Sequence, residues 1–156
     1  MTQILFYHLN NQSLGKVLHR LLERSLERDW RVAIQCKTRS RLDALDTYLW
    51  TFSDESFLPH AAEGSMVEEA TFHPIWLTIK DDNLNNAHIR FLIDNAEPPD
   101  MRNYERCVFM FEGSDLEAVS GAHIQWKALK CQNHELIYWQ QNGRNWIKKT
   151  SLSRQD

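Results

Sequence analysis

The chain has 156 residues, of which 42% are hydrophobic and 25% are charged, and its formal net charge at pH 7 is −3. The composition is typical of globular proteins, and the length suits a single domain with a substantial core. The charge excludes the basic domain that tight binding to nucleic acid normally requires, so we expect any link to nucleic acid to be indirect.

Compartment and membrane contact can be predicted from the cysteines and the apolar runs. The three cysteines, at positions 36, 107 and 131, are an odd number at wide spacing, which argues against a disulfide framework and for a reducing compartment. The first residues lack the basic segment and the long apolar run of a signal peptide. No apolar run approaches the roughly 18 residues of a membrane span. We predict a cytoplasmic protein without membrane contact.

The first part of the chain alternates strands and helices. Residues 4–9 predict a strand, and Ser13 is placed to cap a helix. A second strand is predicted over residues 31–36, and a second helix from residue 40 to about residue 50. This order implies right-handed crossovers and a parallel sheet. The predicted apolar stripe of the first helix comprises Leu14, Val17, Leu18, Leu21, Leu22 and Leu26, and that of the second comprises Leu42, Leu45 and Leu49.

Residues 51–74 show no regular pattern, and the elements resume after Pro74. Strands are predicted over residues 75–79, 88–93 and 107–111. Residues 114–117, Ser-Asp-Leu-Glu, form a capping box for a third helix that runs to about residue 130. A last strand over residues 136–140 precedes a turn at Asn142-Gly143. We predict one α/β domain over residues 1–150 with a mostly parallel sheet, followed by a flexible basic and polar tail over residues 151–156.

The sequence lacks the patterns of cofactor sites and catalytic centres. A nucleotide over the first strand-to-helix turn would need several glycines, and that turn holds only Gly15. The histidines and cysteines show no metal-ligand spacing, so we predict no metal site. The paired acids Glu68-Glu69 and Asp81-Asp82 have no partner base in sight. We expect no cofactor and no catalysis; a small metal-dependent nuclease-like enzyme built from loop acids is the alternative.

Two aromatic residues, Trp50 and Phe57, lie around the exit of the second helix. At about 100° per residue, Trp50 falls about 100° from the middle of the leucine stripe, at the edge of the buried face. An exposed pair of rings would form an apolar patch of the kind that marks protein-binding sites. The alternative is that both rings are core residues near a turn.

The third helix carries a second candidate surface. Its predicted buried face consists of Ala118, Ala122, Trp126 and Leu129. His123 and Lys127 project to one side of this face, near Val119. The two cations could hold the carboxylates of an acidic peptide while Val119 and the edge of Trp126 receive an aromatic ring. The alternative is that Lys127 and Lys130 are only favourable charges near a helix C-terminus.

Three stretches of the chain carry a family resemblance: residues 42–60, which end in Ser-Phe-Leu-Pro-His, the start of the third helix after residues 109–113, and residues 126–149, which contain Tyr-Trp-Gln-Gln. Together they are similar to the chi subunit of bacterial DNA polymerase III, an accessory of the clamp-loader complex. Their order and spacing agree over nearly the whole chain. The resemblance implies a Rossmann-like three-layer fold without a nucleotide-binding glycine loop and without catalytic activity.

The same resemblance implies a replisome adaptor with two docking surfaces. The aromatic pair that binds the psi subunit, or alternatively a helicase-like repair protein, corresponds to Trp50 and Phe57. The pocket for the acidic, phenylalanine-ended tail of single-stranded-DNA-binding protein corresponds to Val119, His123, Trp126 and Lys127. Relatives usually have an arginine where this chain has His123. Because a neutral imidazole cannot clasp a carboxylate as arginine does, we expect weaker tail binding that strengthens at lower pH.

A third hypothesis is direct binding of nucleic acid by Arg144, Lys148, Lys149 and Arg154. This basic patch is small, and phosphate contacts weaken steeply with salt. We therefore expect no binding by this patch that survives physiological salt.

Overall fold

The computed structural model describes residues 2–10, 12–51, 60–62, 73–132, 134–143 and 145–152, with side chains except at positions 50, 60, 61 and 150–152. The helices are α1 (Leu14–Glu27), α2 (Arg39–Thr51), the short 3-10 helix η2 (Met101–Asn103) and α3 (Leu116–Lys130). The strands are β1 (Gln3–Leu9), β2 (Val32–Gln35), β3 (His60–Ala62), β4 (Ile75–Thr78), β5 (Ile89–Ile93), β6 (Arg106–Glu112), β7 (Glu135–Asn142) and β8 (Asn145–Leu152).

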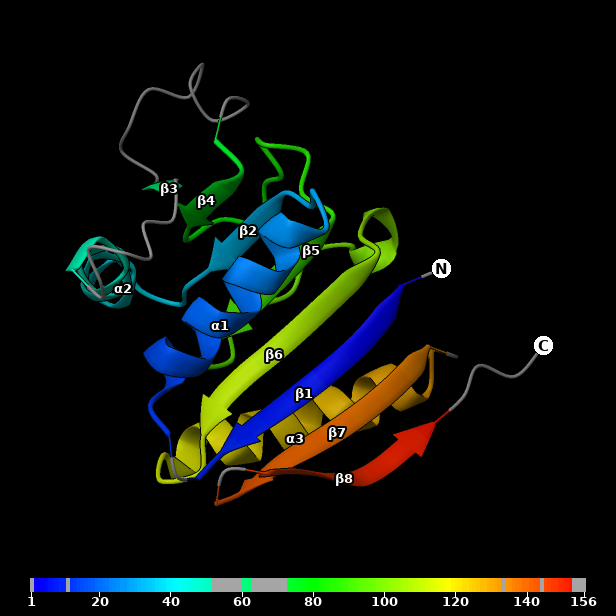
Figure 1. The fold of residues 1–156 in the computed structure, drawn as a ribbon. Helices are drawn as coiled ribbons and strands as arrows, with labels where there is room; N and C mark the ends of the chain where they lie inside the picture. The colour runs from blue at the N-terminus through cyan, green and yellow to red at the C-terminus, as the bar shows by residue number, and fades with distance from the viewer. Residues whose placement is uncertain are drawn as a thin grey trace.

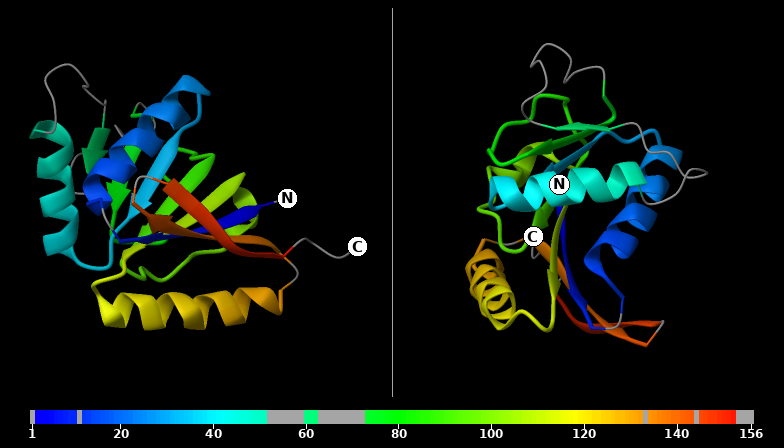
Figure 2. Two further views of the ribbon diagram at one scale, coloured as in Figure 1. Left: turned by 60° about the horizontal axis from the view of Figure 1, so that its bottom comes forward. Right: turned by 90° about the vertical axis from the view of Figure 1, so that its left-hand side faces the viewer.

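The strands form one sheet in the order β3-β4-β2-β5-β6-β1-β7-β8. Neighbouring strands are parallel throughout, except that β7 and β8 form an antiparallel hairpin. Helices α1 and α2 lie on one face and α3 on the other (Figure 1 and Figure 2). The structure confirms the predicted three-layer α/β fold with a mostly parallel sheet.

The hydrophobic core has one half on each face of the sheet. Under α1 and α2 it contains Leu18, Ile34 and Phe91, all fully buried. Under α3 it contains Phe6 and Phe109, whose rings stack with centroids 4.5 Å apart. Burying each such ring contributes about 1.5–3 kcal/mol, so both halves stabilise the fold strongly.

The predicted elements agree with the structure, apart from the unpredicted short helix η2, the cap of α3, and strands β3 and β8. The cap of α3 is Asp115 rather than Ser114, because its carboxylate accepts a hydrogen bond from the Ala118 N–H at 3.2 Å. The short strand β3 lies within the region predicted to be irregular. Strand β8 was not predicted, and the described residues 151 and 152 of the predicted tail belong to it. The Ser13 cap of α1 and the predicted leucine face of α2 are confirmed.

Candidate functional site

Helix α3 buries one side and exposes the other, largely as predicted. Ala118, Ala122 and Leu129 are buried, which confirms three members of the predicted inward face. Trp126 is only half-buried, and its ring meets those of Phe6 and Tyr138 edge-on at centroid distances of 5.3 and 5.8 Å. The Trp126 ring therefore belongs partly to the core and partly to the surface.

The other predicted residues of this surface lie beside Trp126. His123 and Lys127 are exposed, and Val119 is half-buried against the same half of the core. The arrangement offers solvent a hydrophobic edge next to an imidazole and an ammonium group, which is a combination able to hold an acidic peptide with an apolar tip.

Tyr138 is a member of this surface that the sequence did not suggest. Its hydroxyl lies 2.8 Å from Nδ1 of His8 and 3.5 Å from Nε2 of His123, so one phenol connects two imidazoles. Gly113 makes room for this cluster, because a Cβ there would lie only 2.5 Å from Nε2 of His8. These residues come from β1, the turn after β6, β7 and α3, and no sequence spacing links them.

Burial sets the protonation of the cluster. Desolvation raises the pKa of Tyr138 to about 12, so its hydroxyl stays neutral at physiological pH. Desolvation and then the nearby His123 lower the pKa of His8, which favours its neutral imidazole. His8 and Tyr138 therefore form a neutral support behind the exposed His123.

The side chain of Asn95 packs closely against the backbone of α3. The side-chain N–H of Asn95 donates to the Ala118 carbonyl at 2.9 Å. A Cβ at Gly121 would come within 2.4 Å of the same Asn95 nitrogen, so only glycine leaves this contact undisturbed. Asn95 itself has a left-handed backbone with φ of 65°, which asparagine tolerates better than most residues.

The second predicted surface lies mostly beyond what the structure describes. Trp50 belongs to α2, but its side chain is not among those described, and Phe57 falls outside the described residues. Leu42, Leu45 and Leu49 are buried, as the predicted phase of the helix requires. The outward orientation of Trp50 and Phe57 stays a prediction.

The buried cysteines and the acidic residues bear on the enzymatic alternative. Burial raises the pKa of the Cys36 and Cys107 thiols to about 12, which disfavours the reactive thiolate. In the described ranges, no group of three or more His, Cys, Asp or Glu side chains could hold a metal ion. Glu68 and Glu69 fall outside those ranges.

Among the described helices, none is long and apolar enough to span a bilayer.

Comparison with known proteins identifies a family and a curated relative that are similar to much of the chain. The sequence model of the family described as DNA polymerase III chi subunit, HolC, matches residues 1–137. The probable DNA polymerase III subunit chi of Rickettsia prowazekii (strain Madrid E) is 28% identical over 97 residues, which are 62% of this chain and 58% of that relative. The chain thus spans less than two thirds of the relative's length. Because the family match covers most of the chain, the protein belongs to the DNA polymerase III chi subunit family.

Proposed function

We propose that this protein is a non-catalytic adaptor of the replisome in the cytoplasm. It would connect the psi subunit of the clamp loader with the C-terminal tail of single-stranded-DNA-binding protein, and could alternatively engage a helicase-like repair protein. Membership of the chi subunit family supports an accessory role in DNA replication. The observation that carries the proposal further is the exposed surface of α3, where two potential cations lie beside the half-buried Trp126.

In the proposed tail site, Lys127 attracts the acidic residues of the tail and Trp126 with Val119 receives its terminal ring. Lys127 is exposed, so its attraction is long-ranged and weakened by salt. Trp126 offers the larger apolar area, and tryptophan is the residue most enriched among binding hot spots. Affinity should therefore depend more on Trp126 and salt sensitivity more on Lys127.

His123 gives the tail site a dependence on pH. A protonated imidazole donates from both ring nitrogens and carries charge, whereas the neutral ring can only donate one hydrogen bond. Tail binding should therefore be stronger at lower pH, because a charged imidazole would attract the carboxylates of the tail. His123→Arg should remove this dependence and raise affinity at neutral pH, because arginine is always charged and forms bidentate pairs with carboxylates.

Isothermal titration with a synthetic acidic peptide ending in phenylalanine tests the tail site. We expect Trp126→Ala or Lys127→Ala to weaken binding by about 1–3 kcal/mol, as truncation of a hot spot does. Lys37→Ala, an exposed lysine between β2 and α2, is the control and should leave affinity unchanged. Absence of binding at low salt, or equal affinity in all variants, would reject the tail site.

The psi site is tested by co-purification of the two proteins. Trp50→Ala and Phe57→Ala should each abolish capture of psi while the circular dichroism spectrum stays that of the wild type. If either variant instead loses its fold, that ring is a core residue and the docking role is wrong for it.

A further inference from the structure

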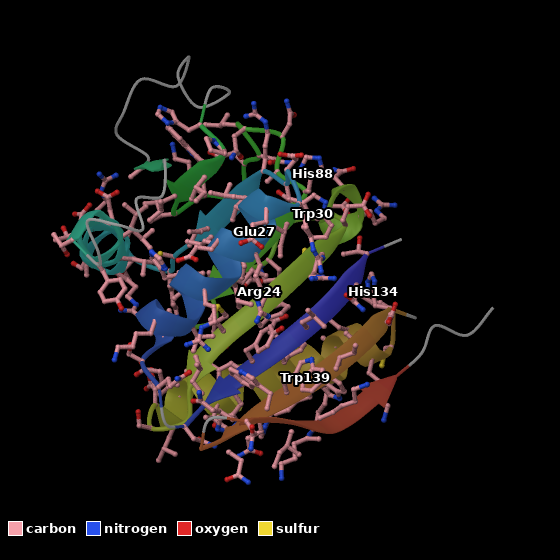
Figure 3. All side chains as sticks on the ribbon, in the orientation of Figure 1. Arg24, Glu27, Trp30, His88, His134 and Trp139 are labelled. Carbon is pink, nitrogen blue, oxygen red and sulfur yellow. The ribbon has the colours of Figure 1, made fainter. Side chains whose placement is uncertain are left out.

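The face of the sheet opposite α3 is left open beside α1. Helix α1 lies over the middle of the sheet, and no described helix covers this side of β1, β7 and β8 (Figure 1). Between α1 and the β7–β8 hairpin lies a groove of about 340 Å³, whose rings and cations come from Tyr7, Trp139, Trp146, Arg20 and Arg24. Figure 3 shows Arg24 on α1 and Trp139 on β7 on this side of the molecule.

The aromatic wall of this α1–hairpin groove follows from strand register. Tyr7 on β1 pairs with Trp139 on β7, and Trp139 pairs with Lys148 on β8, so these three side chains share one face. Trp146 joins them, with its ring edge-on to Tyr7 at 5.0 Å between centroids. The Tyr7, Trp139 and Trp146 rings are all half-buried, and Nζ of Lys148 lies 5.5 Å from the Trp139 ring.

The opposite wall is cationic. Arg20 and Arg24 on α1 and Arg28 at its C-cap are exposed at intervals of four residues, which places them along about 12 Å of one side of the helix. A smaller cavity of about 100 Å³ shares Tyr7, Leu21 and Arg24 with the groove and continues it toward Arg28, Trp30 and Arg106. There the Arg28 and Arg106 guanidinium carbons lie 5.2 and 5.3 Å from the centroid of the Trp30 ring.

These arginines form no ion pair within the part of the chain that the structure describes. None of the ion pairs there involves Arg20, Arg24, Arg28 or Arg106. Burial and then the charge of Arg28 lower the pKa of Arg106, whereas the opposing influence of Glu135 is the weakest of those acting on it. Positive charge is therefore concentrated along the groove although the whole chain is acidic.

We propose that the α1–hairpin groove binds a short stretch of single-stranded nucleic acid. Its arginines would contact successive phosphates, and the exposed parts of Trp139 and Trp146 would stack on bases, which is the combination that binds single strands without sequence preference. The replication family of this chain makes such a ligand available. Trp139, Trp146 and Lys148 all follow residue 137, where the family match ends, so the groove depends on residues outside that match.

The walls of the groove favour a nucleic acid over an acidic peptide. An extended peptide needs partners for its own N–H and C=O groups, usually at the open edge of a sheet. This groove is built from the middle of a helix and the face of a sheet, where backbone groups are already hydrogen-bonded to one another. A nucleic acid strand requires only cations and rings, and the groove supplies both.

Fluorescence anisotropy of a labelled oligothymidylate, at about 20 mM and about 200 mM salt, tests the proposal. We expect weak binding at low salt that Arg20→Gln/Arg24→Gln reduces about tenfold, with a salt slope smaller by about two units. Lys37→Gln/Lys130→Gln removes the same charge from exposed positions that do not line the groove and should leave both quantities unchanged. Trp146→Leu should weaken binding about 5- to 100-fold through lost stacking.

Circular dichroism and thermal melting of each variant establish that it is folded; should Trp146→Leu unfold, the arginine pair carries the test. No binding at low salt, or equal losses in the two double variants, would overturn the proposal. The proposal would also be overturned if the groove bound an acidic peptide through Arg20 and Arg24 but did not bind the oligonucleotide. The tail site on α3 lies on the other face of the sheet (Figure 2), so its peptide titration succeeds or fails independently.

Discussion

Replacement of Arg90 by methionine is expected to destabilise the fold strongly. Arg90 in β5 is fully buried, and its guanidinium donates to four acceptors. Two are side-chain oxygens, of Gln35 at 2.7 Å and of Tyr104 at 3.1 Å. The other two are the backbone carbonyls of Lys80, at 2.6 Å, and Asp82. The single side chain therefore ties the loop after β4 to β2 and to the residue after η2.

The size of the effect follows from these acceptors. Methionine fills much of the same volume but donates no hydrogen bond, and each buried acceptor left without a partner costs about 1–3 kcal/mol. Since some acceptors can find new partners, we expect a total loss of about 3–5 kcal/mol in the free energy of unfolding. In a chain of this length that corresponds to a fall in Tm of roughly 6–20 °C.

Urea and thermal unfolding followed by circular dichroism measure this loss. Arg102→Met is the matched control, because Arg102 is exposed and pairs only locally with Asp100; its midpoint should equal that of the wild type. Arg90→Lys keeps a charge but reaches fewer acceptors, so its stability should fall between those of the wild type and Arg90→Met. If Arg90→Met unfolds at the same midpoint as Arg102→Met, the buried network does not stabilise the fold as argued.

Three further predictions concern the surroundings of α3 and the thiols. In a double-mutant cycle, the change in the free energy of unfolding caused by Gly121→Ala should be more favourable by about 1–2 kcal/mol in an Asn95→Gly background than in the wild type. In the wild type the new methyl group would clash with Asn95 and break its hydrogen bond to Ala118, whereas without the Asn95 side chain neither loss can occur. Additive effects would contradict the close contact between Asn95 and α3. Because the folded state lowers the pKa of His8, the free energy of unfolding of the wild type should decrease as the pH falls below about 6.5, and that of His8→Asn should decrease less. Urea unfolding at several pH values measures this, and an equal decrease in both proteins would refute it. Only the exposed Cys131 should react rapidly with a disulfide reagent in the native protein, and all three thiols should react after denaturation; fast reaction of two native thiols would be inconsistent with the burial of the others.

The architecture was predictable because local patterns and tertiary packing agree over most of the chain. The leucine stripe of α1 is buried or half-buried along its length, since an apolar period of 3.6 residues can satisfy only one helix face. The short apolar runs became parallel strands, and their near-complete burial explains why they show no alternation. Asp115 displaced Ser114 as the cap of α3 because both residue types can serve and the pattern alone does not choose between them.

Strand β8 was missed although its turn was recognised. Its residues are largely polar, so hydrophobicity gives no strand signal. The Asn142-Gly143 pair, with Gly143 at φ of 64°, is nevertheless a characteristic hairpin turn, and it could have indicated a strand on its far side. Without β8 the groove could not be predicted either. Arg20 and Arg24 then belong simply to the solvent-exposed side of α1, with no opposite wall.

The contacts of the candidate sites depend on the order of strands in the sheet, which the sequence does not encode locally. The Tyr138 hydroxyl meets His8 because β7 pairs with β1, 130 residues away along the chain. Tyr7 meets Trp139 for the same reason. Sequence spacing predicts which side chains lie together within one helix, as it did for His123 and Lys127. It does not predict which side chains meet when a site is assembled from several strands.

The two proposed ligand surfaces are the opposite faces of the same strands. Side chains alternate along a strand, so Phe6 and Tyr138 face α3, whereas Tyr7 and Trp139 face the α1–hairpin groove. The connection from β6 to β7 passes over β1, so α3 covers one face of that strand. Helix α1 connects β1 to β2 and lies over the middle of the sheet, so it leaves the other face of β1 open. Ligands on the two faces would be separated by the thickness of the sheet and could not collide. An acidic protein tail and a nucleic acid strand could therefore be held at the same time if both proposals are correct.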